Sequence, residues 1–451
     1  MKGKGRKMNK KAHRIVISVS LLLAFIIPVE AGSQVIGMLT IERLSLLDTY
    51  RTGARPFAMG GAYTAVSDDA FALLFNPAGL TQVEKSEIIF GIQHLKLDID
   101  NEYESWNSAT SNSYTSFGHL AMATPAGSYG NNMVIGFGVF RVGSSDVEYI
   151  RKGLRLDLDG MLENVFLQSG SIFQYRFGIG VELVDNISVG ATIVLWDESA
   201  TFTETLRFNE TGSDSSYLYI DDSSAELDGI SMEFGLMMWL NRYMRAGLTF
   251  STPASLSYTG SGNDHYKGTF PDGIEWNTAS ESFLTEDDLT LPMKFKGGLS
   301  FQSGYFLAAA DISYCDYSQT KFNGLKLIDM NYPGRSILRE VVNYNIGAEF
   351  AFPSAPLKIR AGYSYMPLKL KGMDELTYVI DTVDEWSLVT EYDYFDVNDE
   401  RQFFTFGIGG IVDDLLTLDL GLAFGSYERE TRYLKEKRDI MEVAVTAGYR
   451  F

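Results

Sequence analysis

The sequence predicts an all-β protein, a membrane-spanning antiparallel barrel of about fourteen strands. Three observations support this fold class. Apolar and polar residues alternate along most of the chain, the predicted connections are short at one end and long at the other, and a compact Gly- and Ala-rich segment precedes the strands. The first two are typical of membrane barrels, whose strands turn one side to lipid and the other to the lumen. The third indicates that the barrel encloses a filling segment.

The composition of the 451-residue chain is compatible with this fold and argues against a nucleic-acid partner. Hydrophobic residues make up 45% of the chain, the mean hydropathy is −0.04 and the formal net charge is −20. Strands that alternate apolar and polar residues average to a hydropathy near zero, so this value does not argue for a soluble protein. An acidic chain does not complement the phosphates of nucleic acid.

The first 31 residues are expected to form a secretory signal peptide. A basic region ends at Arg14, an apolar run covers residues 15–28, and Val29 and Ala31 precede a plausible cleavage site. The apolar run is shorter than the roughly 20 residues that a membrane-spanning helix requires. The predicted organisation is therefore a signal peptide (1–31), an N-terminal segment with a hatch (32–85) and a barrel (86–451).

Strict alternation identifies the strands. In the last predicted strand, Met441, Val443 and Val445 fall on one face, and Glu442 and Ala444 fall on the other. About fourteen such segments follow residue 85, each about as long as a tilted membrane strand. Short turns such as 184–186 alternate with long links at 259–290 and 371–400. A soluble β-sandwich is the alternative, but it does not explain a second face rich in Gly, Ser, Thr and interspersed charges.

The segment from Gly53 to Leu80 is compact and irregular. Its glycines permit close backbone approach, its adjacent carboxylates are candidates to cap backbone N–H groups or to pair with cations of the wall, and its end is a turn-forming run. These predicted hatch residues are Gly60, Gly61, Asp68, Asp69, Asn76, Pro77 and Ala78.

On these residues, together with 291–318, 357–367 and 403–424, the chain resembles the FadL/TodX family of outer-membrane transport proteins. The PorV/PorQ group of the same superfamily shares the N-terminal motif. The ending VTAGYRF is similar to the assembly signal of outer-membrane barrels in general, so it supports the location rather than the function.

The resemblance implies a fourteen-stranded barrel plugged by an N-terminal hatch. It also implies binding of long-chain fatty acids or aromatic hydrocarbons at outer loops and then in a lumen pocket, and release through a lateral opening beside a kink in the third strand. Gly136 and Gly138 interrupt the predicted third strand and are candidates for that kink, although glycine also makes room for a plug. The Asn76-Pro77-Ala78 turn would face it.

Cations on the predicted lumen faces are candidates to bind an anionic head group. They are Arg176, Arg245, Lys294, Lys296, Lys358 and Arg360. Carboxylates fall on the same faces, so pairing between wall residues is the alternative role for most of the six.

Passive uptake of a hydrophobic small molecule across the outer membrane by a monomeric barrel is the leading functional hypothesis. The expected partners are that ligand and outer-membrane lipid. A PorV-like structural or shuttle barrel that docks exported proteins is the alternative. The four histidines are scattered and no nucleophile motif or phosphate loop occurs, so neither catalysis nor a cofactor is predicted.

Overall fold

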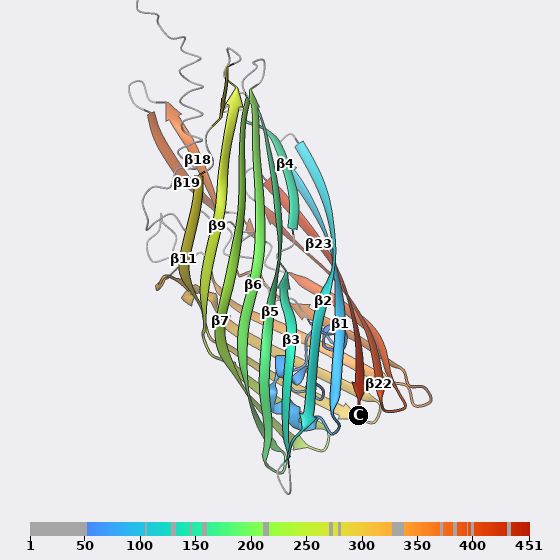
Figure 1. The fold of residues 1–451 in the computed structure, drawn as a ribbon. Helices are drawn as coiled ribbons and strands as arrows, with labels where there is room; N and C mark the ends of the chain where they lie inside the picture. Colours follow the sequence, from blue (N-terminus) through green and yellow to red (C-terminus); the bar gives the residue numbers. More distant parts are fainter. Residues whose placement is uncertain are drawn as a thin grey trace, which may run out of the picture.

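The computed structural model of the chain is a closed antiparallel barrel of fourteen strands, which confirms the predicted fold class (Figure 1). The last strand, β23, pairs with the first, β1, from Glu87 opposite Arg450 to Tyr103 opposite Leu434. This pairing closes the sheet and rules out the β-sandwich alternative, because a sandwich leaves two open sheets. The structure describes residues 52–103, 106–127, 132–144, 147–155, 160–210, 216–269, 274–277, 281–326, 338–369, 373–381, 386–394, 396–397, 401–430 and 434–451.

Three of the fourteen barrel strands are each built from two consecutive pieces. These are β3 (Met133–Ser144) with β4 (Val147–Arg155), β8 (Met244–Ser251) with β9 (Ala254–Thr269), and β11 (Glu281–Leu291) with β12 (Lys294–Ser303). The others are β1 (Glu87–Tyr103), β2 (Trp106–Pro125), β5 (Gly160–Val184), β6 (Ile187–Glu210), β7 (Ser216–Asn241), β13 (Phe306–Asp316), β16 (Glu340–Ala351), β17 (Lys358–Tyr365), β21 (Gln402–Val412), β22 (Leu416–Glu430) and β23 (Leu434–Arg450).

Additional strands, outside the fourteen of the barrel, belong to the long connections at one end of the molecule. They are β10 (Glu275–Asn277), β14 (Lys321–Phe322), β15 (Leu325–Lys326), β18 (Met373–Asp381), β19 (Trp386–Tyr394) and β20 (Asp396–Val397). The short turns lie at the opposite end, together with the C-terminus (Figure 1). None of the helices among the described residues is long and apolar enough to cross a bilayer.

Several strands are much longer than the sequence predicts. β5, β6 and β7 have 25, 24 and 26 residues, whereas a tilted membrane strand needs about 9–11. The predicted link at 259–290 is partly strand, since β9 continues to Thr269 and β11 begins at Glu281. That link was predicted as loop because its Gly-, Ser- and Thr-rich sequence lacks an apolar face toward lipid.

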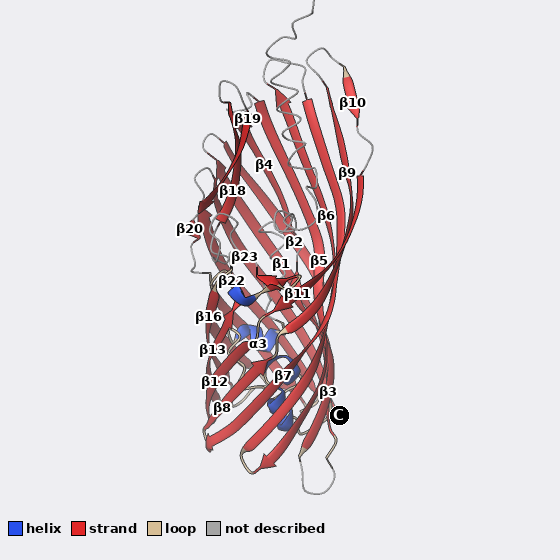
Figure 2. Cartoon of the chain, turned by 90° about the vertical axis from the view of Figure 1, so that its left-hand side faces the viewer, coloured by secondary structure: helices blue, strands red, loops and turns tan. Residues whose placement is uncertain are grey.

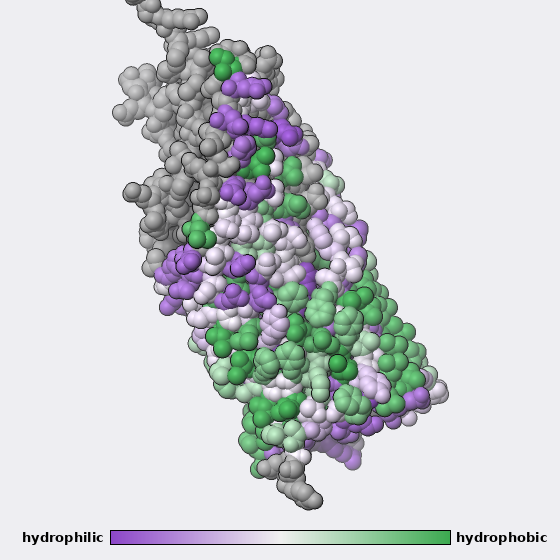
Figure 3. Space-filling model, viewed as in Figure 1, coloured by the Kyte–Doolittle hydropathy of each residue, from purple (hydrophilic) through white to green (hydrophobic). Residues whose placement is uncertain are grey.

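The two faces of the wall exchange their polarity along the strands. In the lower part of β1, Ile88, Phe90 and Ile92 are exposed on the outside. Higher on the same strand, Leu97 and Ile99 are buried on the inside, and the outward positions carry charged and polar residues. An apolar belt therefore surrounds the lower half of the molecule, with a polar surface above it (Figure 3). Such a belt is what lipid-facing barrel walls present.

Residues 52–83, here called the inner segment, lie inside the belt part of the barrel (Figure 2). They form α3 (Ala54–Ala58), α4 (Ala72–Phe75) and the 3-10 helix η2 (Pro77–Gln82). The inner segment is hydrogen-bonded to wall strands at several points, among them Ala54 N to Thr446 Oγ1 at 2.9 Å and Ser300 Oγ to the Ala65 carbonyl at 3.0 Å. Residues 32–51 of the predicted hatch lie outside the described residues, so the hatch as a whole stays a prediction.

Candidate ligand site in the barrel lumen

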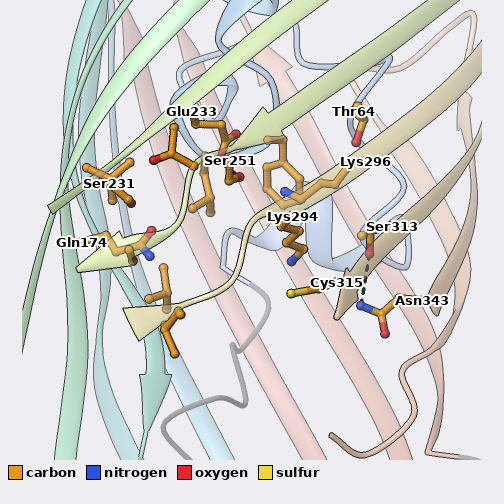
Figure 4. Close-up of a pocket in the computed structure, with 18 of the residues that line it drawn as sticks. Thr64, Gln174, Ser231, Glu233, Ser251, Lys294, Lys296, Ser313, Cys315 and Asn343 are labelled. Carbon is orange, nitrogen blue, oxygen red and sulfur yellow. Dashed lines mark hydrogen bonds between the residues drawn. The ribbon is translucent and has the colours of Figure 1, made fainter. Parts of the chain in front are cut away.

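A cavity of about 210 Å³ lies in the lumen beside the inner segment (Figure 4). Its walls come from β5, β6, β7, β12 and β13, and Leu74 and Phe75 of α4 form part of its lining. Alternation places the lining positions of each strand two residues apart, as with Ser231 and Glu233 on β7. The cavity is thus a product of barrel closure, because no single stretch of sequence contains it.

Two lysines are among the charged residues of the cavity lining, which also include Arg176, Glu233 and Asp311. Lys294 and Lys296 occupy alternate positions of β12, so both side chains enter the lumen, and that of Lys294 points toward Cys315 (Figure 4). The Lys296 ammonium also lies 5.8 Å from the ring centre of Phe75. Among the described residues, no carboxylate comes within 4 Å of either ammonium group. These two predicted head-group candidates therefore line the cavity without a carboxylate in contact.

Three of the other four predicted head-group candidates are paired with carboxylates. Arg176 donates to the Leu73 carbonyl at 2.7 Å and contacts Glu233 at 3.4 Å. Arg360 bridges Glu349 at 2.7 Å and Asp419 at 2.6 Å, and Lys358 contacts the same Glu349 at 3.2 Å.

Arg245 lies outside the cavity lining, as do Lys358 and Arg360. It stacks on the Trp239 ring, with the guanidinium carbon 4.8 Å from the ring centre. The structure therefore brings together three of the six candidate cations at one cavity, and of these Arg176 is paired with Glu233 whereas Lys294 and Lys296 have no carboxylate within 4 Å among the described residues.

An apolar side of the cavity faces the lysines. Trp196, Leu291, Leu74 and Phe75 supply rings and branched chains, and Cys315 adds its sulfur. Cys315 is the single cysteine of the chain and is buried. A compact body with one charged or polar end would match this division, since apolar walls orient a ligand only through a few placed polar groups.

The predicted hatch carboxylates form an ionic cluster within the inner segment. Arg55 contacts Asp68 at 2.5 Å and Asp69 at 3.2 Å, and the Tyr63 hydroxyl donates to Asp69 at 2.6 Å. Burial raises the pKa of Asp69 above its usual range, although Arg55 opposes the shift. Asp69 also accepts a hydrogen bond from the Phe71 N–H at 3.1 Å, as a capping role requires. The cation that pairs with both carboxylates is Arg55, which belongs to the inner segment and not to the wall.

The cluster is tied to the wall through Arg55. Its guanidinium reaches Glu349 of β16 at 3.1 Å, and Glu349 is the residue that Arg360 and Lys358 also contact. The inner segment and three wall strands thus share one buried charge network, because Asp419 of β22 joins it through Arg360.

The Asn76-Pro77-Ala78 turn packs against β5, β6 and β7, and its position relative to a kink in the third strand stays a prediction. The Asn76 side chain accepts from Ala78 N–H at 3.1 Å and donates to the carbonyls of Thr64 and Leu236 at 2.9 and 3.1 Å. On the wall, Gly190 and Gly235 leave room for this turn, and a Cβ at either position would collide with it.

Gly60 and Gly61 have positive φ angles of 65° and 83°. A Cβ on Gly60 would lie 2.7 Å from the Ile346 carbonyl oxygen, so the close approach predicted for this glycine pair is present at Gly60.

Gly136 and Gly138 lie in regular strand. β3 pairs in unbroken register with β2 from Val134 to Phe140, and with β5 from Met133 to Arg141. The ladders therefore run through both glycines without a break, and Gly136 accommodates the Leu73 side chain of the inner segment. A functional kink at these positions stays a prediction.

Sequence reasoning missed Trp196 and the cavity side of Cys315, whereas it placed Glu233 on the lumen face as a partner for the lumen cations. The signal that was available is alternation, since Val194 and Trp196 on β6 and Ser313 and Cys315 on β13 are lumen positions two residues apart. The strand pairing needed to place them at one level was not available from the sequence.

Fold and cavity define a closed antiparallel β-barrel with a cavity in its lumen. A family model described as BamG, a FadL-like family, matches residues 50–352, well over half of the chain, and the chain belongs to this family. The predicted recognition of a FadL/TodX-type protein is thereby confirmed. No curated protein matches the sequence.

Solved structures resemble the chain over most of its length. The toluene transporter TodX of Pseudomonas putida aligns with a TM-score of 0.63 and 16% identity, over 90% of this chain and 99% of that one. A FadL homologue of Pseudomonas aeruginosa gives 0.59 and 12%, over 89% and 98%. The toluene transporter TbuX of Ralstonia pickettii gives 0.57 and 15%, over 90% and 99%. Identities this low establish a common fold and nothing finer.

Proposed function

We propose that this chain mediates passive uptake of hydrophobic small molecules across the outer membrane of a Gram-negative-type cell. The carrying observation is the lumen cavity, whose lining combines apolar side chains with Lys294 and Lys296. The shared fold with proteins named as toluene transporters and as a FadL homologue supports the same proposal. The apolar belt supports an outer-membrane location, and the short-turn end faces the periplasm as in bacterial barrels.

The size of the cavity favours a compact solute. A dry cavity of about 150 Å³ is known to accept benzene, and this one measures about 210 Å³. A monoaromatic ring or a short acyl chain fits that volume, whereas a long-chain fatty acid needs additional space. Of the two predicted substrate classes, small hydrocarbons therefore fit the cavity as it stands.

Lys294 and Lys296 are proposed to bind the anionic end of solutes that carry one. An ammonium group that reaches a carboxylate forms a charge-assisted hydrogen bond, which is about twice as strong as a neutral one. A neutral hydrocarbon would use only the apolar side.

The inner segment is proposed to act as the hatch that prevents leakage. It fills the lumen below the cavity, and a lateral exit spares the solute from displacing it. The third strand, with Gly136 and Gly138, is one proposed position for that exit. The protein is proposed to work as a monomer surrounded by lipid.

A second candidate function is a PorV-like structural or shuttle barrel that docks exported proteins. The observation in its favour is the long extension of β5, β6 and β7 beyond the apolar belt, which presents charged side chains such as Asp228 and Glu226 to the outside. A docking role of this kind would not depend on solute binding in the cavity.

Ligand binding to the purified barrel tests the uptake proposal. We expect toluene and laurate to bind, and Ala254→Phe, which fills the cavity beside Leu291, to weaken both at least tenfold. Leu248→Phe is the matched control, because Leu248 is 56% exposed on the outer face. Equal affinities in the wild type and Ala254→Phe, or no binding by the wild type, would contradict the proposal. Isolation of the wild type with exported proteins and without solute binding would favour the docking role.

A further inference from the structure

Three neighbouring strands of the wall are interrupted at the same height, beside the cavity. β8 gives way to β9 at residues 252–253, β11 gives way to β12 at 292–293, and β13 ends where the 3-10 helix η3 (Tyr317–Gln319) begins. The first two interruptions contain Pro253 and Pro292, which have no N–H to donate to a ladder. Residues 252–253, 292–293 and 316–320 are here called the wall window.

Strand pairing stops across the wall window and resumes beyond it. Below it, Lys294 pairs with Ser251 on one side and with Cys315 on the other. Above it, Leu291 pairs with Ala254, and Thr290 pairs with Lys321. The segment between β8 and β9 remains hydrogen-bonded to β7, since the Thr252 N–H donates to the Met232 carbonyl at 2.9 Å. The interruption is therefore confined to the two seams that flank β11 and β12.

The cavity reaches the wall window from inside. Thr252, Leu291, Pro292 and Tyr317 belong to its lining, and so do Met232 and Ile312, whose residues are exposed on the outer face. Lys294 is both the last paired residue below the window and a cavity cation. One charged group thus stands at the place where lumen and outer surface come closest.

The wall window lies at the upper boundary of the apolar belt. Below it on β12, Phe295 and Leu299 are 46% and 51% exposed on the outside. Above it on β9, the exposed outward positions are Ser255, Ser257 and Thr259. In a membrane with the short turns in the periplasm, this height corresponds to the head-group level of the outer leaflet.

Above the cavity the lumen is filled by apolar side chains from opposite walls. Leu97 and Ile99 of β1 pack with Ala200 and Phe202 of β6 in one buried cluster, against which Tyr258 of β9 also packs. A second cluster, Leu227, Ala254 and Leu256, lies between this cluster and the cavity lining at Trp196 and Leu291. These two clusters lie in the lumen above the cavity, and the inner segment occupies the lumen below it.

We infer that the wall window is a lateral doorway through which the cavity both receives and returns an anionic amphiphile of the outer leaflet. The inference rests on the proposed function for a ligand in the cavity, and it differs from the predicted route, which begins at the outer loops and leaves at the third strand. The amphiphile keeps its head at the leaflet surface and moves sideways. Its carboxylate or phosphate meets Lys294 first and then Lys296, while its apolar body enters along Leu291 and Trp196.

Restoring the ladder donors tests the doorway. In Pro253→Val/Pro292→Val the seam between β8/β9 and β11/β12 regains two N–H groups and two strand-forming residues. The probe is a maleimide carried on the head group of phosphatidylethanolamine in vesicles, and its target is Cys315. We expect the labelling rate to fall at least tenfold in this variant and in Met293→Trp, which places a ring over the window at a position now 45% exposed. Pro353→Val and Leu299→Trp are the matched controls, and total thiol is titrated after unfolding.

Equilibrium binding of laurate separates this inference from the proposed function. Laurate affinity should be unchanged in Met293→Trp, because Met293 lies outside the cavity lining, while the rate of laurate exchange with vesicles falls. Wild-type protein that binds laurate but labels and exchanges as fast as both window variants would overturn the doorway and leave the cavity proposal standing. A larger fall in the labelling rate on substitution of Gly136 and Gly138 than on substitution of the window residues would likewise overturn the doorway, in favour of the third strand. Wild-type protein that binds neither laurate nor toluene would overturn the proposed function itself.

Discussion

Replacing the two cavity lysines should separate binding of anionic from neutral solutes. Lys294→Met and Lys296→Met keep the length of each side chain and remove only its charge. The two positions are two residues apart on one strand, about 7 Å along the chain. A carboxylate therefore contacts one ammonium directly and feels the second at longer range, so the two substitutions should have unequal effects.

The magnitude follows from the contacts that each lysine offers. A hydrogen bond to a charged group contributes about 1.5–3 kcal/mol, and both residues are only partly buried, which favours the lower value. About 1.4 kcal/mol corresponds to a tenfold change in Kd. We expect roughly tenfold weaker laurate binding for the lysine in direct contact and a smaller loss for the other. Toluene affinity should change by less than twofold in both variants.

Isothermal titration or native mass spectrometry of detergent-purified protein measures both ligands. Lys358→Met is the matched control, because Lys358 contacts Glu349 and lies outside the cavity lining. Laurate affinity that is equal in the wild type and in the two cavity variants would refute the head-group assignment. A parallel loss of toluene binding would show instead that the substitutions disturb the cavity as a whole.

Further predictions concern the inner segment and its contacts with the wall. Each is measured as a shift in the temperature at which the barrel unfolds, read from its mobility on gels. Arg360→Met leaves Glu349 and Asp419 without this partner in the lumen and should cost about 3–5 kcal/mol. Gly60→Ala should destabilise by more than about 2 kcal/mol, because its Cβ would meet the wall, whereas Gly304→Ala has open space at a similar φ and should cost about 1. The pKa of Asp69 is higher in the folded protein than in the unfolded chain, so protonation of Asp69 stabilises the fold. This contribution is present at low pH and is lost as the pH rises through the folded pKa. Asp69→Asn should therefore reduce the dependence of the unfolding temperature on pH.

The sequence was sufficient for the strands because alternation over the apolar belt is strict. Phe404, Phe406 and Ile408 on β21 are all exposed on the outside, with small or polar residues between them, as the period of two predicts. The extensions above the belt were missed for the same reason. There the lipid-facing requirement ends, polar residues move outward, and an exposed Ser or Thr is equally compatible with a loop and with a strand.

The candidate site was predictable only in part, because charge can be read from sequence and pairing cannot. Six lumen cations were identified, but the distance between Arg360 and Asp419 depends on a register that joins residues 59 positions apart. The wall window gave a local signal, Pro253 and Pro292, yet its meaning depends on both prolines lying at one height on adjacent strands. That height is fixed by the pairing of Ser251 with Lys294.

The charge network of Arg55 limits how far the inner segment can move during transport. Withdrawing the inner segment as a unit would separate Arg55 from Glu349, so that the buried Glu349 carboxylate of the wall would lose one of its cationic partners. Breaking a buried pair costs about 3–5 kcal/mol, which corresponds to a population near 10⁻³ when each 1.4 kcal/mol is a factor of ten. The hydrogen bonds to Thr446 and Ser300 would be lost as well, which lowers that population further. Passage through the wall window disturbs none of these contacts, so a sideways route gives faster exchange than any route that requires the inner segment to leave.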